Sequence, residues 1–305
     1  MGAFQGSIAG ALSSRARRLR RLGRRALLAL PLLFVAGLLF VPLGQMFLWS
    51  VWERAGFWVR PGFTLAWYRT FVTGARLTVL ERSLVVAVGV TVLGLLLAYP
   101  IAYFLARHVR REFSRAILLL FTVPFLVNYI IRTFSWVYLL SRTGPINRAL
   151  VALGITDRAV DWLLFSDFAV CLGLLSSYMP FMIYPLWAAL EGIEQPVIEA
   201  SWLLGAPPPR TFFSVTLPLS MPGVFAAVTF GFVGSFGEGA VPIILGGVGY
   251  QLMGNTITSA LDVLNYPLAA AMSSVVVMAM LLFLVAWYLA FDLRAVLGKI
   301  AHWRF

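Results

Sequence analysis

The sequence predicts an all-α polytopic membrane protein with six transmembrane helices and a short helix in the loop between spans 4 and 5. Two features of composition and one of pattern support this. Of the 305 residues, 61% are hydrophobic and only 12% are charged, whereas a soluble domain carries roughly a quarter charged residues. Apolar runs of about 20 residues, long enough to cross a bilayer, recur along the chain.

The six predicted spans are separated by short or mixed segments. They cover residues 26–51, 83–107, 116–140, 168–190, 221–245 and 268–291. Residues 1–25 form a basic arm with seven arginines and no acid, and residues 293–305 form a short basic tail. We therefore divide the chain into the arm, one membrane domain over residues 26–292, and the tail.

The distribution of basic residues predicts that both chain ends lie in the cytoplasm. An even number of spans places both ends on one side, and Lys and Arg accumulate in cytoplasmic segments. Fifteen of the 24 Lys and Arg lie in the arm, in residues 107–115, in residues 191–220 or in the tail, and eight lie in the segments of the opposite side. The net charge of +12 is thus explained by membrane topology, and we expect no nucleic-acid partner.

The chain lacks the sequence signatures of an enzyme. No glycine-rich phosphate loop of the GxxxxGK[ST] type occurs, and the two histidines, His108 and His302, lie far apart. The single cysteine, Cys171, lies in an apolar run. We expect no catalytic residue, no metal site and no cofactor in this chain, so the energy for active transport must come from another subunit or an ion gradient.

The loop of residues 191–220 is the one water-exposed interruption with a defined local pattern. It predicts a short helix, a glycine turn and the start of a second helix. Glu199 follows Pro196 by three residues, so we expect this carboxylate in the first helical turn, where the helix dipole favours an acid. Gly205 has the conformational freedom to end the helix, and the prolines at 207–209 prevent its continuation.

These residues carry a resemblance to a known family. The pattern consists of Glu199-Ala200-Ser201, three residues, Gly205, nine residues, Val215, one residue, and Leu217-Pro218. It resembles the E-A-A loop of the permease subunits of binding-protein-dependent ABC importers, with Ser201 in place of Ala and Val215 in place of Ile. The resemblance implies a type I ABC importer permease fold for the membrane domain.

The resemblance covers about residues 80–290 and is greatest to the spermidine/putrescine branch. The stretches that carry it are Ala98–Phe104, Val123-Pro124-Phe125 with Asn128 and Ile131-Arg132, Pro180-Phe181-Met182, Leu245-Gly246-Gly247 and Gly254-Asn255. It implies import of polyamines across a bacterial inner membrane. The implied partners are the lipid bilayer, a second permease subunit, two cytoplasmic ATPases that bind ATP and Mg, and a periplasmic binding protein.

The resemblance also assigns a role to the E-A-A residues. Its coupling positions are Glu199, Ala200, Ser201, Gly205, Leu217 and Pro218. They would form the coupling helix and its continuation, seated in a groove of the ATPase. ATP-driven closure would then push this helix and rock the spans between inward-facing and outward-facing states.

Two charged residues inside spans are candidates for the solute pathway. Glu238 is the one acid predicted well inside a span, and Arg132 is the intramembrane cation; such charges normally face a partner or a water-filled path. Asn128, Tyr129 and Trp136 share roughly one helical side with Arg132. Glu238 either contacts a cationic solute or pairs with Arg132, and the three neighbours of Arg132 either line the path or pack.

Two alternatives to a polyamine permease remain at this point. The same type of permease could carry iron(III), an aminophosphonate, an opine or another small solute, because Arg132 suits an anion and Glu238 a cation. An ion-coupled secondary transporter is a rival of another class. It predicts inverted repeats, which are not visible here, and it gives no reason for the E-A-A spacing.

Overall fold

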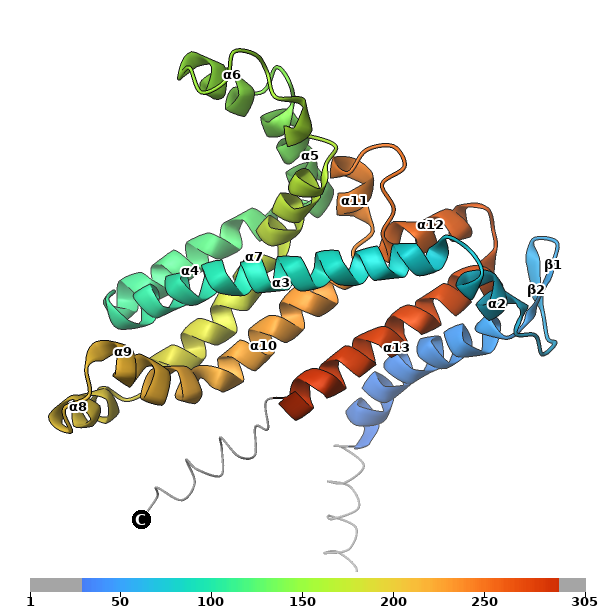
Figure 1. Cartoon of the computed structure of the whole chain (residues 1–305). Helices are drawn as coiled ribbons and strands as arrows, with labels where there is room; N and C mark the ends of the chain where they lie inside the picture. Colours follow the sequence, from blue (N-terminus) through green and yellow to red (C-terminus); the bar gives the residue numbers. More distant parts are fainter. Residues whose placement is uncertain (1–28, 291–305) are drawn as a thin grey trace, which may run out of the picture.

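The computed structural model describes residues 29–290 and is helical apart from one small hairpin (Figure 1). The elements in chain order are a first helix Ala29–Ser50, β1 (Glu53–Ala55), β2 (Trp58–Arg60), α2 (Ala66–Val72), α3 (Arg76–Arg107), α4 (Arg111–Leu126), α5 (Tyr129–Leu140), α6 (Pro145–Ala152), the 3-10 helix η1 (Asp161–Leu163), α7 (Asp167–Glu191), α8 (Gln195–Leu203), α9 (Pro208–Thr211), the π-helix η2 (Phe212–Thr216), α10 (Leu217–Phe236), α11 (Ala240–Leu245), α12 (Met253–Asp262) and α13 (Tyr266–Ala290). The predicted arm, residues 1–25, and tail, residues 293–305, lie outside the described residues.

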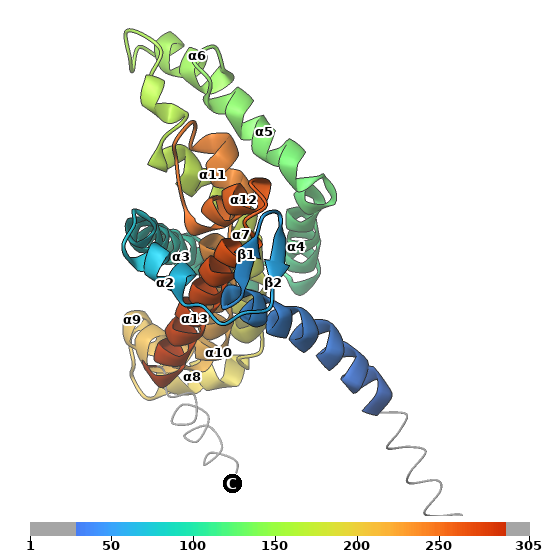
Figure 2. The same cartoon turned by 90° about the vertical axis from the view of Figure 1, so that its right-hand side faces the viewer.

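The predicted all-α membrane fold is confirmed. Five helices in the described part are long and apolar enough to cross a membrane, and a sixth span results when the bent pair Arg111–Phe125 and Tyr129–Ala152 counts as one. The first helix and the α5–α6 segment extend away from the other helices (Figure 2). No part of the apolar window of the first helix is buried.

Helices α3, α7 and α10 form the centre of the bundle, and small residues let them approach closely. A Cβ on Gly223 of α10 would lie 2.6 Å from Ala189 Cβ of α7. A Cβ on Gly94 of α3 would lie 2.8 Å from Met182 Sδ, and one on Gly231 of α10 would lie 2.9 Å from the same atom. Glycines at helix crossings are typical of membrane bundles, where packing rather than the hydrophobic effect holds helices together.

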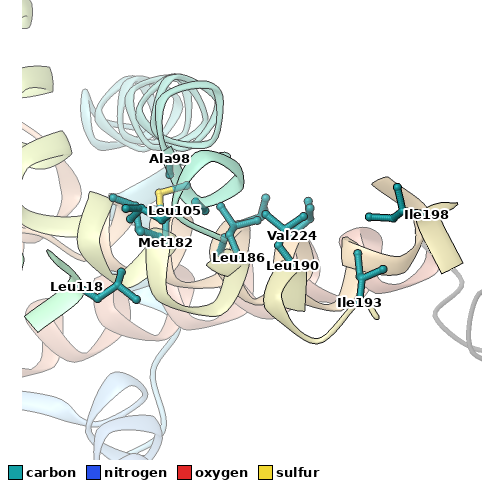
Figure 3. Close-up of a cluster of buried hydrophobic side chains, with 13 residues drawn as sticks. Ala98, Leu105, Leu118, Met182, Leu186, Leu190, Ile193, Ile198 and Val224 are labelled. Atoms are coloured by element: carbon teal, nitrogen blue, oxygen red, sulfur yellow. The ribbon is translucent and has the colours of Figure 1, made fainter. Parts of the chain in front are cut away.

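An apolar cluster joins these three helices to α8 (Figure 3). Leu186 and Leu190 of α7 and Val224 of α10 pack in it with Leu118 of α4, and Ile198 of α8 is buried at its end. The short helix α8 is therefore attached to the bundle through an apolar side chain. A displacement of α8 would be transmitted to α7 and α10 through this contact.

The predicted span over residues 116–140 is broken, so its continuity was wrong. Helix α4 ends at Leu126, α5 begins at Tyr129, and the two segments bend by 89°. Val127 has an extended backbone, and Asn128 caps the start of α5 by accepting the N–H of Ile130 at 2.9 Å. Pro124 weakens the last turn of α4 because it lacks an N–H.

The predicted span over residues 221–245 is also broken and begins earlier than expected. Helix α10 starts at Leu217, after the π-helix Phe212–Thr216, and ends at Phe236. The backbone leaves the helix at residues 237–239 and resumes as α11. Hydropathy cannot register an interruption of three residues, two of them glycine, inside an apolar run.

Three of the segments that separate the predicted spans, residues 53–81, 141–167 and 246–267, contain regular elements. They hold the β1–β2 hairpin, α2, α6, η1 and α12, and α3 starts at Arg76 rather than at residue 83. The spans over residues 168–190 and 268–291 correspond closely to α7 and to the described α13. The predicted helix, glycine turn and second helix over residues 191–220 are confirmed as α8, Gly205 and α9.

Candidate substrate pathway and coupling segment

Glu238 lies in the break between α10 and α11, and its carboxylate caps the start of α11. Oε1 accepts the backbone N–H groups of Gly239 at 3.0 Å, Ala240 at 2.8 Å and Val241 at 3.4 Å. The hydroxyl of Tyr178 donates to Oε2 at 2.6 Å. An acidic side chain at a helix N-terminus is favourable, so the start of α11 is a suitable place for Glu238.

Close backbone packing holds this break in place. A Cβ on Gly254, at the start of α12, would lie 2.2 Å from the carbonyl oxygen of Glu238, and one on Gly239 would lie 3.3 Å from the backbone of Gly254. A Cβ on Gly234 would lie 2.3 Å from the ring of Tyr178. The glycines thus allow the break to contact α12 and allow Tyr178 to reach the carboxylate.

Arg132 does not form the ion pair with Glu238 that was one of the two expectations. Within residues 29–290, the side-chain ion pairs are Arg82 with Asp167, Arg111 with Glu191 and Arg142 with Asp161. Arg132 instead donates from Nη1 to the carbonyl oxygen of Pro124 at 3.3 Å, and its guanidinium lies 4.4 Å from the ring centroid of Phe125. Pro124 lies in the last turn of α4, where carbonyl groups have no partner within the helix. Its carbonyl oxygen is therefore free to accept the hydrogen bond from Arg132.

Tyr129 lies between the two charges. The guanidinium of Arg132 is 5.7 Å from the centroid of its ring. Its hydroxyl is buried and is close enough to Glu238 to interact with the carboxylate. The structure therefore brings Glu238, Tyr129 and Arg132 together with Tyr178, from α5, α7 and the break after α10.

The other two predicted pathway residues have packing or capping contacts. Asn128 is exposed and uses its side-chain oxygen to cap α5. Trp136 packs in the apolar cluster of α5, α7 and α11 and donates from Nε1 to Ser176 Oγ at 3.0 Å. These contacts account for both side chains without a solute.

Tyr178 was not among the residues predicted from sequence. It is a tyrosine in the apolar helix α7, 60 residues before its partner Glu238, and no local pattern relates the two. The available signal was Gly234, whose missing side chain makes room for the ring.

In the described residues, no group of three His, Cys, Asp or Glu side chains could hold a metal ion. The carboxylate of Glu238 still has acceptor capacity on Oε2, because an ionised carboxylate accepts about four hydrogen bonds. A carboxylate with aromatic faces beside it suits an ammonium group.

The candidate coupling segment, residues 195–218, begins with an exposed helix that has a regular end. Helix α8 begins at Gln195 with Pro196 at its second position, so Glu199 is the fifth helical residue and the prediction of a first-turn carboxylate was wrong. Gly205 has φ +80°. Its N–H donates to the carbonyl of Trp202 at 2.8 Å, and the N–H of Ala206 donates to that of Ser201 at 3.1 Å, which is the Schellman arrangement.

The surface of this segment is unusually apolar. Leu203 and Leu204 are 89% and 88% exposed, and Trp202 and Val197 are also exposed. Glu199 and Ala200 are exposed beside them. An exposed apolar patch with a few polar groups is typical of a protein-binding surface.

Two contacts hold the second half of the coupling segment. Ser201 Oγ lies 2.9 Å from Thr211 Oγ1, which connects α8 to α9. The N–H of Leu217 donates to the carbonyl of Phe212, five residues earlier, and Pro218 follows at the second position of α10. The π-helix and α10 continue α9, so the coupling segment joins the spans on both sides.

A family model covers most of the membrane domain. Residues 90–295 match the model of binding-protein-dependent transport system inner membrane components, and the chain belongs to this family. It is a multi-pass inner-membrane permease of an ABC importer, a component that carries no cofactor of its own and is not itself the ATPase. Such a system works with a separate ATPase and a substrate-binding protein, and this excludes the ion-coupled secondary transporter.

Three permease proteins of known transport systems are similar to this chain in sequence. The spermidine/putrescine transport system permease protein PotB of Escherichia coli (strain K12) is 34% identical over 231 residues, 75% of this chain and 83% of that protein. The inner membrane ABC transporter permease protein YdcU of the same organism is 33% identical over 247 residues, 77% of each chain. The molybdenum transport system permease protein ModB of Azotobacter vinelandii is 30% identical over 171 residues, 56% of this chain and 73% of that protein.

A solved structure supports the fold. A bacterial ABC transporter involved in the import of the acidic polysaccharide alginate aligns with a TM-score of 0.73 and 16% identity, over 90% of this chain and 98% of that chain. At this identity the likeness shows the architecture and not the solute.

Proposed function

We propose that this permease imports polyamines of the spermidine and putrescine class into the cytoplasm. The observation that carries the proposal is the carboxylate of Glu238, which accepts helix N–H groups and has no basic partner among the described residues. A polyamine has ammonium groups that such a carboxylate attracts, and the rings of Tyr129 and Tyr178 offer faces for cation–π contact. The similarity to PotB supports the same class of solute.

The proposed machine contains more than this chain. A second permease subunit completes the pathway, two ATPases bind ATP and Mg, and a periplasmic binding protein delivers the solute. We further infer from the distribution of Lys and Arg that both chain ends and α8 lie on the cytoplasmic side of the membrane. The apolar, exposed surface of α8 supports its docking on an ATPase.

Transmission follows from the packing of α8. ATP-driven closure displaces α8, and Ile198 passes the displacement to Leu190 of α7 and Val224 of α10 through their shared cluster. Helix α10 ends at Phe236, two residues before Glu238, so movement at the coupling segment reaches the break that holds this acid. The ATPase thereby shifts the population of states rather than acting on the solute.

Transport of labelled solute by the complete complex tests the cargo. The permease pair, the ATPase and the cognate binding protein are reconstituted in proteoliposomes, and uptake of radiolabelled spermidine, putrescine and molybdate is measured with ATP and with a non-hydrolysable analogue. We expect ATP-dependent accumulation that excess unlabelled putrescine suppresses and molybdate does not. ATP-dependent uptake of an anion, with none of either polyamine, would overturn the proposal.

One observation favours an anionic solute as the second candidate. The Nε of Arg132 is buried without a partner in the described part of the chain, so the guanidinium has a donor to offer. The relationship to ModB points in the same direction. The uptake experiment separates the two candidates because the competing solutes carry opposite charge.

Substitution at the glycine turn tests the coupling role. Gly205→Leu places a side chain where φ is +80° and where space is open, so strain and bulk fall on the coupling segment alone. Gly154→Leu is the matched control, because Gly154 has φ +68° and equally open space but follows α6. We expect Gly205→Leu, and likewise Glu199→Trp, to reduce copurification of the ATPase while Gly154→Leu does not. Equal copurification and uptake in all variants would remove α8 from the coupling role.

A further inference from the structure

A cluster of three side chains connects the loop after α11 to α3 and α7, at the end of the bundle opposite α8. The hydroxyl of Tyr250 donates to Asp167 Oδ1 at 2.6 Å, and Arg82 Nη2 donates to the same oxygen at 2.9 Å. The guanidinium of Arg82 lies 4.1 Å from the ring centroid of Tyr250. We call Arg82, Asp167 and Tyr250 the Tyr250 latch.

Tyr250 is anchored in the protein while its partners are exposed. Only 8% of Tyr250 is exposed, and its ring occupies the space where a Cβ on Gly246 would lie 2.4 Å away. Burial, together with the hydrogen bond to Asp167, raises the pKa of Tyr250, so its hydroxyl remains a donor at physiological pH. The side chains of Arg82 and Asp167 are 42% and 69% exposed, and exposed ion pairs contribute little to stability.

The loop around Tyr250 is also connected to α12 and α3. Asn255 donates from Nδ2 to the carbonyl of Tyr250 at 2.7 Å and accepts the N–H of Leu252 at 2.7 Å. The N–H of Met253 donates to Ser83 Oγ at 2.8 Å. Val248, two residues before Tyr250 in the same loop, is fully exposed.

Helix α11 lies between the latch and the Glu238 break. It has six residues, about 9 Å of helix, capped by Glu238 at its start and followed by the latch loop at its end. It packs tightly on α7, since a Cβ on Gly173 would lie 2.4 Å from Leu245 Cδ1 and 2.9 Å from Val241 Cγ1. A helix this short and tightly packed moves as a unit, so displacement of the latch loop displaces the N–H groups on Glu238.

We propose that the Tyr250 latch positions α11 during transport. When the latch is closed, it holds the Glu238 site in the geometry described here. The pathway opens at this end of the bundle only when the latch is released. The latch is suited to release because one donor is buried and permanent, whereas the acceptor and the arginine are accessible to water. The exposed loop tip at Val248 provides the contact through which a docking protein could release it.

The proposal deepens the proposed ATP-driven cycle and rests on it, but it does not depend on the cargo. If the cycle itself were misassigned, the wild-type complex would show no hydrolysis stimulated by its binding protein. A fault in the latch proposal alone would leave that stimulation intact.

Tyr250→Phe removes one hydroxyl and keeps the buried ring. In the complete transporter in lipid nanodiscs, ATP hydrolysis is measured with and without loaded binding protein. We expect hydrolysis without binding protein to rise about threefold to tenfold, because a closed state that loses a hydrogen bond to a carboxylate is less populated. The stimulation by binding protein should shrink accordingly.

Tyr68→Phe is the matched control. The hydroxyl of Tyr68 donates to Ser50 Oγ at 2.8 Å, so this change also removes one hydroxyl hydrogen bond, but it does so between α2 and the end of the first helix. We expect unchanged hydrolysis in this control. Equal hydrolysis without binding protein in wild type, Tyr250→Phe and Tyr68→Phe would overturn the proposal.

Asp167→Ala provides a second route, because it removes the acceptor and leaves the Tyr250 ring in place. It should raise hydrolysis without binding protein as Tyr250→Phe does, and the double variant should exceed the stronger single variant by less than about twofold, since both changes open one latch. Independent, multiplicative effects, or no effect of Asp167→Ala, would count against a shared latch.

Discussion

The charged side chains of Glu238 and Arg132 each lie at a break between two helices, and each contacts the opposite kind of helix end. At the break between α10 and α11, the carboxylate of Glu238 accepts N–H groups at the start of the following helix. At the break between α4 and α5, the guanidinium of Arg132 donates to the carbonyl of Pro124 in the last turn of the preceding helix. Each charge complements the helix end it contacts.

This comparison explains why the two charges need not pair with each other. A charge inside a membrane requires a partner, and here the backbone of each break supplies one. Glu238 and Arg132 therefore both retain capacity for a third group: the carboxylate through Oε2, and the guanidinium through its buried Nε. The broken helix, rather than an ion pair, is the element that keeps an unpaired charge at this depth.

The two breaks differ in how tightly the rest of the protein holds them. The Glu238 break contacts the backbone of α12 at Gly254 and receives the hydroxyl of Tyr178. The break at residues 127–128 is exposed, and it bends by 89°. Changes at the Glu238 break should therefore have larger effects than changes at the Arg132 break.

The largest effect should come from Glu238 itself. Glu238→Gln keeps an oxygen for the N–H groups of α11 but removes the charge, and we expect uptake of spermidine to fall by about tenfold or more, which corresponds to about 1.4 kcal/mol of lost interaction with a cation. Uptake in proteoliposomes measures it. Asp262→Asn, which removes an acid at the end of α12, is the control and should leave uptake unchanged. Wild-type uptake in Glu238→Gln would remove this carboxylate from the pathway.

The next effect tests the rigidity of the same break. Gly254→Ala places a Cβ 2.2 Å from the carbonyl oxygen of Glu238, and backbone cannot yield as a flexible side chain would. We expect a loss of about 1–3 kcal/mol in stability, seen as a lower unfolding temperature in detergent, together with reduced uptake. Gly89→Ala has nothing within 4 Å of its Cβ and should not destabilise. An unchanged unfolding temperature in Gly254→Ala would mean that the break is as adaptable as the one near Arg132.

The sequence predicts the long helices well because residues within each helix determine where it forms. Apolar runs define α7 and α13, and the freedom of Gly205 to adopt positive φ defines the end of α8. The predicted position of Glu199 within α8 was wrong because proline is tolerated at the first or the second position of a helix. In α8, Pro196 is the second residue, so Glu199 lies one position further into the helix than expected. A shift of one or two residues at a helix start escapes any local rule.

The breaks and their contacts depend on residues far apart in sequence. Gly237 and Gly239 indicate that local unwinding is possible, but the contact with Gly254 and the donor Tyr178 decide that it occurs. The ion pair between Glu238 and Arg132 was a reasonable expectation from charge alone. It failed because each side chain has a nearer backbone partner, which charge counting does not include.

Arg132→Gln compares the two charges directly. It removes the donor to the carbonyl of Pro124 and the cation above Phe125. Because a cationic solute gains nothing from Arg132, we expect uptake of spermidine to fall by no more than about fivefold, the effect of one lost hydrogen bond on the geometry of the break. Arg132→Lys, which keeps the charge without the planar fork, is the control. A greater loss of uptake in Arg132→Gln than in Glu238→Gln would reverse the order of the two breaks and favour an anionic solute.

The smallest effect should come from Asn128. This residue either caps α5 or lines the solute pathway, and the two roles lead to different predictions. As a helix cap, it needs only the side-chain oxygen that accepts the N–H of Ile130. Asn128→Ala should then cost about 1 kcal/mol, or about 2–4 °C in the unfolding temperature of a chain this long, and Asn128→Asp should retain stability because aspartate caps equally well. As a pathway residue, it would also use its amide N–H groups, so Asn128→Asp would alter uptake while leaving the unfolding temperature intact. Measuring both quantities on both variants separates the roles, and a cap that is restored by Asp with normal uptake would leave Glu238, Tyr129 and Arg132 as the pathway residues of this region.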